Sequence, residues 1–345
     1  MTNKHVIVAG HLCLDLMPDL STVPDGRFYT LCQPGRMVHA GKLAASAGGV
    51  VANTGLALYR LGVPVQLIGK IGQDLFGEMI QALIREHSPE LVNDLVRDPS
   101  TSTGYTIIIN PPGEDRAFLH APGSNDMFYA SDLSRGKRKA ADLFHFGYPS
   151  LMRSIYRGEG GELVSIMQRA RREGLTTSLD YSLPDPTSPA GLADWPRIMA
   201  NSLPYVDCFL PNAEELVFLF DRKLYHQIAD RPEIPFLDAI TPAMLHALSD
   251  VALSYGVKLV LVKVGHRGIY LRTASADSWK KTGRALEPVD ETWFEQELWA
   301  PVFQTEVQGN TGAGDAASAG FLAGILNGGG PEAALQSAAA AGAAS

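Results

Sequence analysis

A glycine-rich segment near the end of the chain, Gly309-Asn310-Thr311-Gly312-Ala313-Gly314-Asp315, runs directly into an apolar stretch from Ala316 to Leu326. This pattern predicts a turn that opens a helix. The first turn of a helix has backbone N–H groups without intrahelical acceptors, and the helix dipole adds partial positive charge, so a phosphoryl group can be held there. Gly312, Ala313 and Gly314 have little or no side chain, which lets the backbone approach a phosphate closely.

Asp315 stands at the start of this expected helix. A carboxylate at that place can orient a hydroxyl that attacks the phosphorus atom and can accept its proton. The alternative is that Asp315 caps an Ala/Gly-rich helix, which is the commoner role of an aspartate at a helix start. Position alone leaves both interpretations open.

The composition is that of an ordinary globular protein. The chain has 345 residues with 46% apolar and 19% charged content, and we expect one α/β domain over residues 1–345. The net charge of −8 predicts no nucleic-acid partner and no membrane surface, apart from a local basic run at residues 135–139. The three cysteines lack the spacing of a disulfide framework or a zinc site, and no apolar stretch reaches about 18 residues, so we expect a cytoplasmic protein.

The hydrophobic pattern alternates between strands and helices, which predicts a mostly parallel sheet covered on both faces, a three-layer α/β/α fold. Expected strands cover residues 6–9, 65–69, 143–147, 176–180, 208–211 and 259–264, and expected helices cover residues 50–61, 75–86 and 162–173. Residues 221–242 and 273–301 look like surface insertions without chemistry.

Two segments interrupt this alternation, at about residues 14–45 and 103–122. The first is rich in Pro and Gly, and the second has two strand-like runs on either side of residues 110–115, the pattern of a hairpin. We expect them to form a small β-sheet that stands off the main layer. Such a sheet is either a lid over a site or a surface for oligomer contacts.

Several other chemistries are disfavoured by missing motifs. The chain has no GxxxxGK[ST] loop, no HExxH, no GxSxG and no GxGxxG after its first strand, which argues against a nicotinamide-dependent oxidoreductase among others. The nine histidines are scattered without metal-ligand spacing.

An early segment completes a familiar pair of signatures. The segment from Ser46 to Leu58 contains Gly48, Gly49 and Asn53, and the segment from Gly69 to Gly77 follows it. Together with the Gly-Ala-Gly-Asp segment near the end, they make the chain resemble the ribokinase-like (PfkB) family of small-molecule kinases along nearly its whole length. The resemblance implies a Rossmann-like α/β/α domain with a β-sheet lid. It also implies transfer of the γ-phosphoryl group of ATP to a substrate hydroxyl with Mg²⁺.

The resemblance assigns roles to particular residues. It makes Asp315 the catalytic base and the N–H groups of Gly312, Ala313 and Gly314 the anion hole. It places the substrate beside Asp15, Gly48, Gly49 and Asn53, with Asp15 accepting hydrogen bonds from substrate hydroxyls. It places Asn212 and Glu215 near Mg²⁺ through water, and Lys263, Gly265 and Gly268 near the nucleotide, although a plain turn between strands would also explain these glycines.

Departures from the family pattern narrow the expected substrate. Gly309 stands where the family usually has an aspartate, so we expect no activation by potassium. Asp180 to Pro184 lacks the arginine that would pair with an acidic sugar. The chain ends at Ser345 inside an Ala-rich helix that the family normally follows with further elements, so we expect a natural chain that continues.

The leading hypothesis is therefore a kinase of a neutral monosaccharide. The alternatives are a nucleoside kinase and a sugar- or nucleotide-binding protein without turnover. Aromatic residues reaching the pocket from the lid, such as Phe28, Tyr29 or Phe118, would favour a nucleobase, whereas a polar lid would favour a sugar. His145 and Tyr148 either contact the sugar or simply pack. The lid also suggests a homodimer.

Overall fold

The main sheet has eight strands in the computed structural model, which describes residues 4–23, 33–35, 37–113, 116–134, 141–231, 233–303 and 312–345. The strand order is β14-β13-β12-β11-β10-β9-β1-β4. The strands are β1 (Val6–Gly10), β4 (Val65–Ile68), β9 (Leu143–Gly147), β10 (Thr176–Leu179), β11 (Cys208–Phe209), β12 (Leu259–Lys263), β13 (Ile269–Thr273) and β14 (Glu297–Ala300). All neighbours from β4 to β12 pair in parallel, and β13 and β14 pair antiparallel at one edge, so the expectation of a mostly parallel sheet is confirmed.

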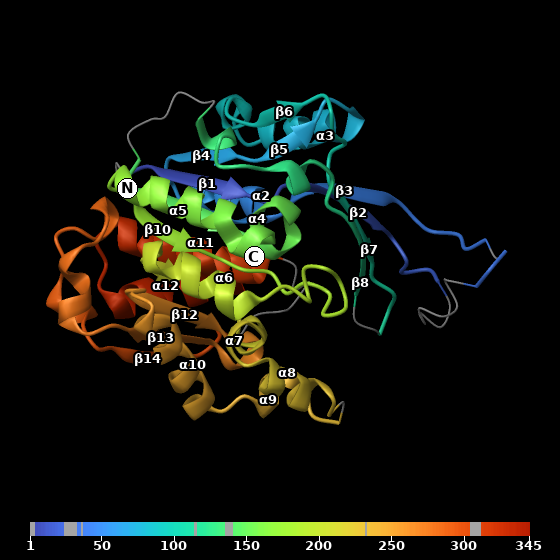
Figure 1. The fold of residues 1–345 in the computed structure, drawn as a ribbon. Helices are drawn as coiled ribbons and strands as arrows, with labels where there is room; N and C mark the ends of the chain where they lie inside the picture. Colours follow the sequence, from blue (N-terminus) through green and yellow to red (C-terminus); the bar gives the residue numbers. More distant parts are fainter. Residues whose placement is uncertain are drawn as a thin grey trace.

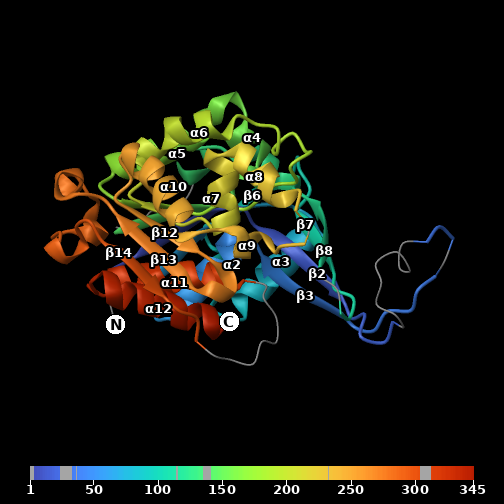
Figure 2. The same ribbon diagram turned by 90° about the horizontal axis from the view of Figure 1, so that it is seen from below.

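Helices cover both faces of this sheet, as Figure 2 shows. On one side lie α2 (Val50–Arg60), α11 (Ala313–Leu326) and α12 (Pro331–Ala343), and on the other lie α5 (Gly161–Arg172), α6 (Trp195–Ser202), α7 (Ala213–Phe220) and α10 (Pro242–Ser254). The remaining helices are α3 (Leu75–Arg85), α4 (Arg153–Tyr156), α8 (Arg222–Ala229) and α9 (Phe236–Ala239). The three expected helices are present within one or two residues of their expected bounds.

Strand β1 shows why the sheet must be buried on both sides. Val6 and Val8 belong to the core beneath α2 and α11, whereas Ile7 and Ala9 belong to the core beneath α5. Successive side chains of a strand point to opposite faces, so an unbroken apolar run fits a strand that has helices above and below it.

A second sheet of four strands projects from one side of the molecule, at the right of Figure 1. Its order is β3-β2-β7-β8, with bounds β2 (Cys13–Pro18), β3 (Leu43–Gly48), β7 (Tyr105–Ile109) and β8 (Ala117–Ala121). Strands β7 and β8 pair antiparallel, which confirms the expected hairpin. Phe28 and Tyr29 lie outside the described residues, as does the basic run at residues 135–139.

The two faces of this projecting sheet differ. Helix α3 covers one face, where the rings of Phe76 and Tyr105 are 5.5 Å apart. Strand register places Asp15, Thr106 and His120 together on the opposite face. The polar face is therefore the one available to a ligand.

The segment at residues 273–301 corrects one expectation. It is not only a surface insertion, because Glu297–Ala300 forms β14 and completes the edge of the main sheet. This strand is short and half exposed, with a charged residue and a tryptophan on its outer positions, so its sequence gives little strand signal.

A two-stranded sheet pairs β5 (Lys70–Gly72) with β6 (Val96–Asp98). Within the described ranges, no helix combines the length and the apolar character needed to cross a membrane.

Candidate active site

Helix α11 begins at the glycine-rich segment, as the sequence predicts. Gly312 is its N-cap residue and has left-handed backbone angles, φ 86° and ψ −9°, which glycine adopts without steric cost. The Gly312 carbonyl accepts the N–H of Ala316 at 2.8 Å and closes the first helical turn. The N–H groups before Ala316 stand outside the helical ladder and can face an anion. Residues 309–311 lie outside the described residues, so the expectation about potassium stays a prediction.

Asp315 is not the N-cap residue of its own helix, because Gly312 holds that position and Asp315 is the third residue of α11. Its carboxylate is only 6% exposed and is held by side chains from other elements. It accepts hydrogen bonds from Asn53 Nδ2 at 2.9 Å and from the Thr54 hydroxyl at 3.3 Å. The Tyr148 phenol lies 2.8 Å from Oδ1 and 2.7 Å from Oδ2. These bonds orient the carboxylate across the first turn of α11.

The three partners of Asp315 come from two places in the fold. Asn53 and Thr54 lie in the first turns of α2, which packs directly against α11. Tyr148 follows strand β9, where parallel strands of an α/β sheet usually carry their ligand-contacting residues. Asn53 and Tyr148 were identified from the sequence. Thr54 was not, although it directly follows Asn53.

The pKa of Asp315 is set by opposing effects. Burial raises it most, and the nearby charge of Asp180 raises it further. The hydrogen bonds from Tyr148 and Asn53 and the charge of Lys263 lower it. The net direction is upward, which is the direction that makes a carboxylate a better proton acceptor near neutral pH.

A buried ion pair lies behind the base. Lys263 Nζ donates to both carboxylate oxygens of Asp180, at 2.8 and 3.0 Å, and Ser318 of α11 donates to the same carboxylate at 2.9 Å. Asp180 is fully buried. The ammonium of Lys263 therefore faces Asp180 beneath the first turns of α11, and a direct contact with nucleotide stays a prediction for this residue.

Asp15 lies on the polar face of the projecting sheet. The Cys13 thiol donates to its Oδ1 at 3.2 Å. Burial raises the pKa of Asp15, and hydrogen bonds from Cys13 and Thr106 partly offset this. A β-carbon at Gly48 would lie 2.0 Å from Asp15 Oδ2, so only glycine leaves room for the carboxylate there.

Position 49 must be a glycine because it lies against His11, a residue that the sequence analysis did not identify as part of the site. Gly49 has φ 81°, and a β-carbon there would lie 2.5 Å from the carbonyl oxygen and 2.6 Å from Nδ1 of His11. Among the residues that the structure describes, neither ring nitrogen of the buried His11 has a hydrogen-bond partner, and burial holds its pKa well below the usual value. The ring lies 5.1 Å from that of His120 and 6.0 Å from that of Tyr148. The only signal for His11 was its place after the first strand.

His145 packs inside the main sheet. Its Nδ1 lies 2.9 Å from the Ser178 hydroxyl on the neighbouring strand, and the ring is fully buried. Burial lowers its pKa to about 4, so it is a neutral core histidine. Of the two alternatives for this residue, the structure supports packing.

Asn212 and Glu215 form the start of helix α7. The Glu215 N–H donates to Asn212 Oδ1 at 2.8 Å, and the Asn212 N–H donates to Glu215 Oε2 at 2.7 Å, which is a capping box. Burial raises the pKa of Glu215 to about 8, with Lys263 opposing and Asp180 reinforcing the shift. Both residues therefore have a structural role. The ionised form of the buried Glu215 carboxylate would be stabilised by a nearby positive charge.

Gly265 and Gly268 make the turn between β12 and β13. Both have positive φ, 54° and 101° respectively. A β-carbon at Gly268 would lie 2.1 Å from the carbonyl oxygen of Ala300. The turn itself explains both glycines, and their contact with a nucleotide stays a prediction.

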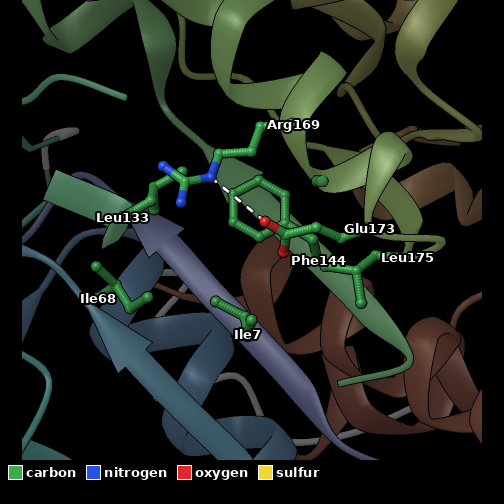
Figure 3. A pocket seen from close by; sticks show the side chains of 8 residues that line it. Ile7, Ile68, Leu133, Phe144, Arg169, Glu173 and Leu175 are labelled. Atoms are coloured by element: carbon green, nitrogen blue, oxygen red, sulfur yellow. Dashed lines mark hydrogen bonds and ion pairs between the residues drawn. The ribbon is translucent and has the colours of Figure 1, made fainter. Parts of the chain in front are cut away.

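The described residues also enclose a small cavity away from this site. Figure 3 shows it between β1, β4, β9 and α5, lined by apolar side chains and the Arg169–Glu173 ion pair. Its volume of about 10 Å³ holds no more than one water molecule. It is too small for a substrate, so the candidate site remains the set of residues around the first turn of α11 and on the polar face of the projecting sheet.

Known proteins resemble this chain along most of its length. The family model described as pfkB family carbohydrate kinase matches residues 4–345. An uncharacterized sugar kinase from Archaeoglobus fulgidus is 26% identical over 273 residues, which cover 79% of this chain and 87% of that protein. A fructokinase from Vibrio alginolyticus is 24% identical over 93% of this chain and 83% of that protein.

Solved structures show the same fold. Arabidopsis thaliana ribokinase, complexed with ribose and ATP, superposes with a TM-score of 0.69 at 20% identity, covering 99% of this chain and 92% of that chain. The ribokinase-like three-layer α/β/α fold expected from the sequence is therefore confirmed.

Proposed function

The chain belongs to the PfkB family of carbohydrate kinases, and on this basis we propose that it transfers the γ-phosphoryl group of ATP to a hydroxyl of a small neutral sugar. One observation carries the proposal. Asp315 stands in the first turn of α11, yet its carboxylate is bound by Asn53, Thr54 and Tyr148 of other elements instead of capping the helix. A buried carboxylate held beside free backbone N–H groups suits proton removal next to a phosphoryl group.

The proposed chemistry divides between side chain and backbone. Asp315 accepts the proton of the attacking hydroxyl, and its upward-shifted pKa supports this role. The N–H groups of Gly312, Ala313 and Gly314 stabilise the charge that develops on the phosphoryl oxygens. The new O–P bond forms at the sugar hydroxyl as the bond to ADP breaks.

The acceptor is proposed to bind between Asp15 and Asn53. Asp15 accepts hydrogen bonds from sugar hydroxyls, and Asn53 already touches the base through its amide. The projecting sheet presents polar groups there, since Thr106 and His120 are joined by a 3.0 Å hydrogen bond beside Asp15. Phe118 lies on the same face one pair farther along the hairpin and is 55% exposed. The Thr106–His120 pair, which is in register with Asp15, favours a sugar, whereas Phe118 on the same face is the feature that keeps a nucleoside kinase as the alternative. The projecting sheet is proposed to act as the lid.

Asn212 and Glu215 are proposed to lie near Mg²⁺. The part of the chain that the structure describes has no cluster of three or more His, Cys, Asp or Glu able to enclose a metal ion. That fits an ion bound mainly by phosphate oxygens and water, which is the usual state of Mg²⁺ in kinases. The buried acidic Glu215 supports the assignment because a nearby cation would stabilise its ionised form. Bound Mg²⁺ would neutralise charge on the phosphate oxygens.

The reaction is proposed to take place in the cytoplasm. Cys13 and Cys208 are both free thiols, as expected in a reducing compartment. A nucleoside kinase remains the alternative within the family. A binding protein without turnover is disfavoured, because the carboxylate, its partners and the free first turn of α11 are all in place.

The test is ADP formation from ATP and Mg²⁺ with a panel of neutral sugars, sugar acids and nucleosides. We expect a neutral sugar to give the highest kcat/KM. A nucleoside as the best acceptor would replace the sugar assignment, and ATP binding without ADP formation for any acceptor would support a binding protein.

A further inference from the structure

The Tyr148 hydroxyl contacts both carboxylate oxygens of the proposed base. It lies 2.8 Å from Oδ1 and 2.7 Å from Oδ2 of Asp315, closer than either of the other two donors. The phenol is an oxygen-bound proton donor, as a sugar hydroxyl is. Its pKa is raised well above the usual value, first by burial and then by the charge of Asp315, so it remains protonated and donates.

The phenol oxygen of Tyr148 lies almost equally far from the two carboxylate oxygens, so its one proton is shared between them and its oxygen fills the space in front of both. Oδ1 accepts from Tyr148 and Thr54, and Oδ2 accepts from Tyr148 and Asn53. Asn53 and Thr54 are fixed in helix α2. An acceptor hydroxyl that takes the position between the two carboxylate oxygens must therefore displace the phenol of Tyr148.

The backbone of Tyr148 has the conformation expected of a functional position. Its angles are φ 62° and ψ 46°, the left-handed region that non-glycine residues rarely adopt. Such a conformation costs free energy and persists where the surroundings impose it, often at active sites. Here it turns the side chain toward Asp315 directly after β9.

We propose that Tyr148 is a positioning residue that takes the place of the acceptor hydroxyl on Asp315 in the empty enzyme and leaves it when the sugar binds. The inference rests on the proposed kinase function and deepens it. While Tyr148 is in place, a water molecule is kept from the position between the two oxygens of Asp315, and this protects ATP from hydrolysis when sugar is absent.

The proposal predicts a specific pH effect. The hydrogen bond from Tyr148 lowers the pKa of Asp315, and the other charged or titratable groups that face the base are Asp180, Lys263 and Glu215. Tyr148→Phe leaves those groups unchanged and removes only the hydroxyl. The pKa of Asp315 in the free enzyme must then rise.

The experiment compares the pH profiles of kcat/KM for the sugar and of kcat in wild type and Tyr148→Phe. The first profile reports the free enzyme and the second the substrate complex. We expect the acid limb of kcat/KM to move to higher pH by about 0.5 to 1 unit, with the acid limb of kcat unmoved. We also expect ATP hydrolysis without sugar to increase several-fold.

Tyr270→Phe is the matched control. Tyr270 also donates to a carboxylate, Glu297 at 2.9 Å, but lies on β13 away from the site, and its removal should leave both profiles and the hydrolysis rate unchanged. A shift of both profiles would show that Tyr148 stays on the base during the reaction, and a shift of neither would give it a purely structural role. Either result overturns the proposal. Failure of the kinase assignment itself would appear separately, as absence of sugar phosphorylation by the wild-type protein.

Discussion

The carboxylate of Asp15 passes so close to Gly48 that a β-carbon on residue 48 would lie 2.0 Å from Oδ2. Any side chain at this position must therefore move Asp15 or the strand that carries it. The family resemblance places both residues beside the substrate. The close approach explains why residue 48 is a glycine: only a residue without a side chain leaves room for the Asp15 carboxylate.

Gly48→Ala should raise the KM for the sugar at least about tenfold and leave the KM for ATP nearly unchanged. The methyl group displaces the Asp15 carboxylate, and a lost hydrogen bond to a charged group is worth about 1.5 to 3 kcal/mol. Steady-state kinetics measure this. Gly161→Ala is the control, since a β-carbon at Gly161 meets no atom within 4 Å. An unchanged KM for sugar in Gly48→Ala would remove Asp15 from the acceptor site.

The buried pair of Lys263 and Asp180 should be required for stability. Lys263→Met leaves the fully buried Asp180 without its cation, which should lower the free energy of unfolding by about 3 to 5 kcal/mol. Replacing both residues, Lys263→Met with Asp180→Leu, should recover most of that loss because no buried charge remains. Urea denaturation of the two variants and the wild type tests this. A single variant as stable as the wild type would contradict the burial of the charge.

Glu215 should make the protein less stable as the pH rises. Burial raises its pKa to about 8 in the folded chain, above the value of 4.5 for an exposed glutamate. Between these values the folded state binds more protons than the unfolded state, so the contribution of Glu215 to the free energy of unfolding falls with increasing pH. Glu215→Gln should therefore gain stability relative to wild type from about pH 5 to about pH 8. A difference that is constant over this range, in urea denaturation without Mg²⁺, would argue against the raised pKa.

The projecting sheet is proposed to form a homodimer. Its edge strand β8 exposes Phe118 and Leu119, each 55% accessible, which is the kind of apolar edge that a partner covers. We expect light scattering to give the mass of a dimer, and Phe118→Glu to give that of a monomer. Val251→Glu, on the distant helix α10, should leave the dimer intact. A monomeric wild type would reject the proposal.

Local pattern was enough to predict most of the fold. The unbroken apolar run at residues 6–9 predicted strand β1, and amphipathic spacing predicted helix α3. The Gly-Ala-Gly-Asp segment predicted the start of α11. Strand β14 was missed because an exposed edge strand needs no apolar run. The pattern thus identified strands with an unbroken apolar run and helices with clear amphipathic spacing, whereas the buried strand β13 and helix α7 were not expected.

Contacts between residues far apart in the sequence were harder to predict. Tyr148 and Asp315 are 167 positions apart, and Asp180 and Lys263 are 83 apart, so their pairing depends on strand order and not on spacing. The place of His11 after the first strand was too weak a signal, because a single histidine after a strand is compatible with many folds. The sequence motifs were enough to propose the site residues, but the groups that shift the pKa of Asp315 could be found only from the structure.

The central claim is that Asp315 is the base for phosphoryl transfer to a sugar. The most direct test is mass-spectrometric detection of sugar phosphate formed from ATP and Mg²⁺ by the wild type and by Asp315→Asn, with ATP binding measured in both. We expect product from the wild type, a turnover lower by a factor of about 10² to 10⁴ in the variant, and similar ATP binding. Equal turnover in the two proteins would contradict the account.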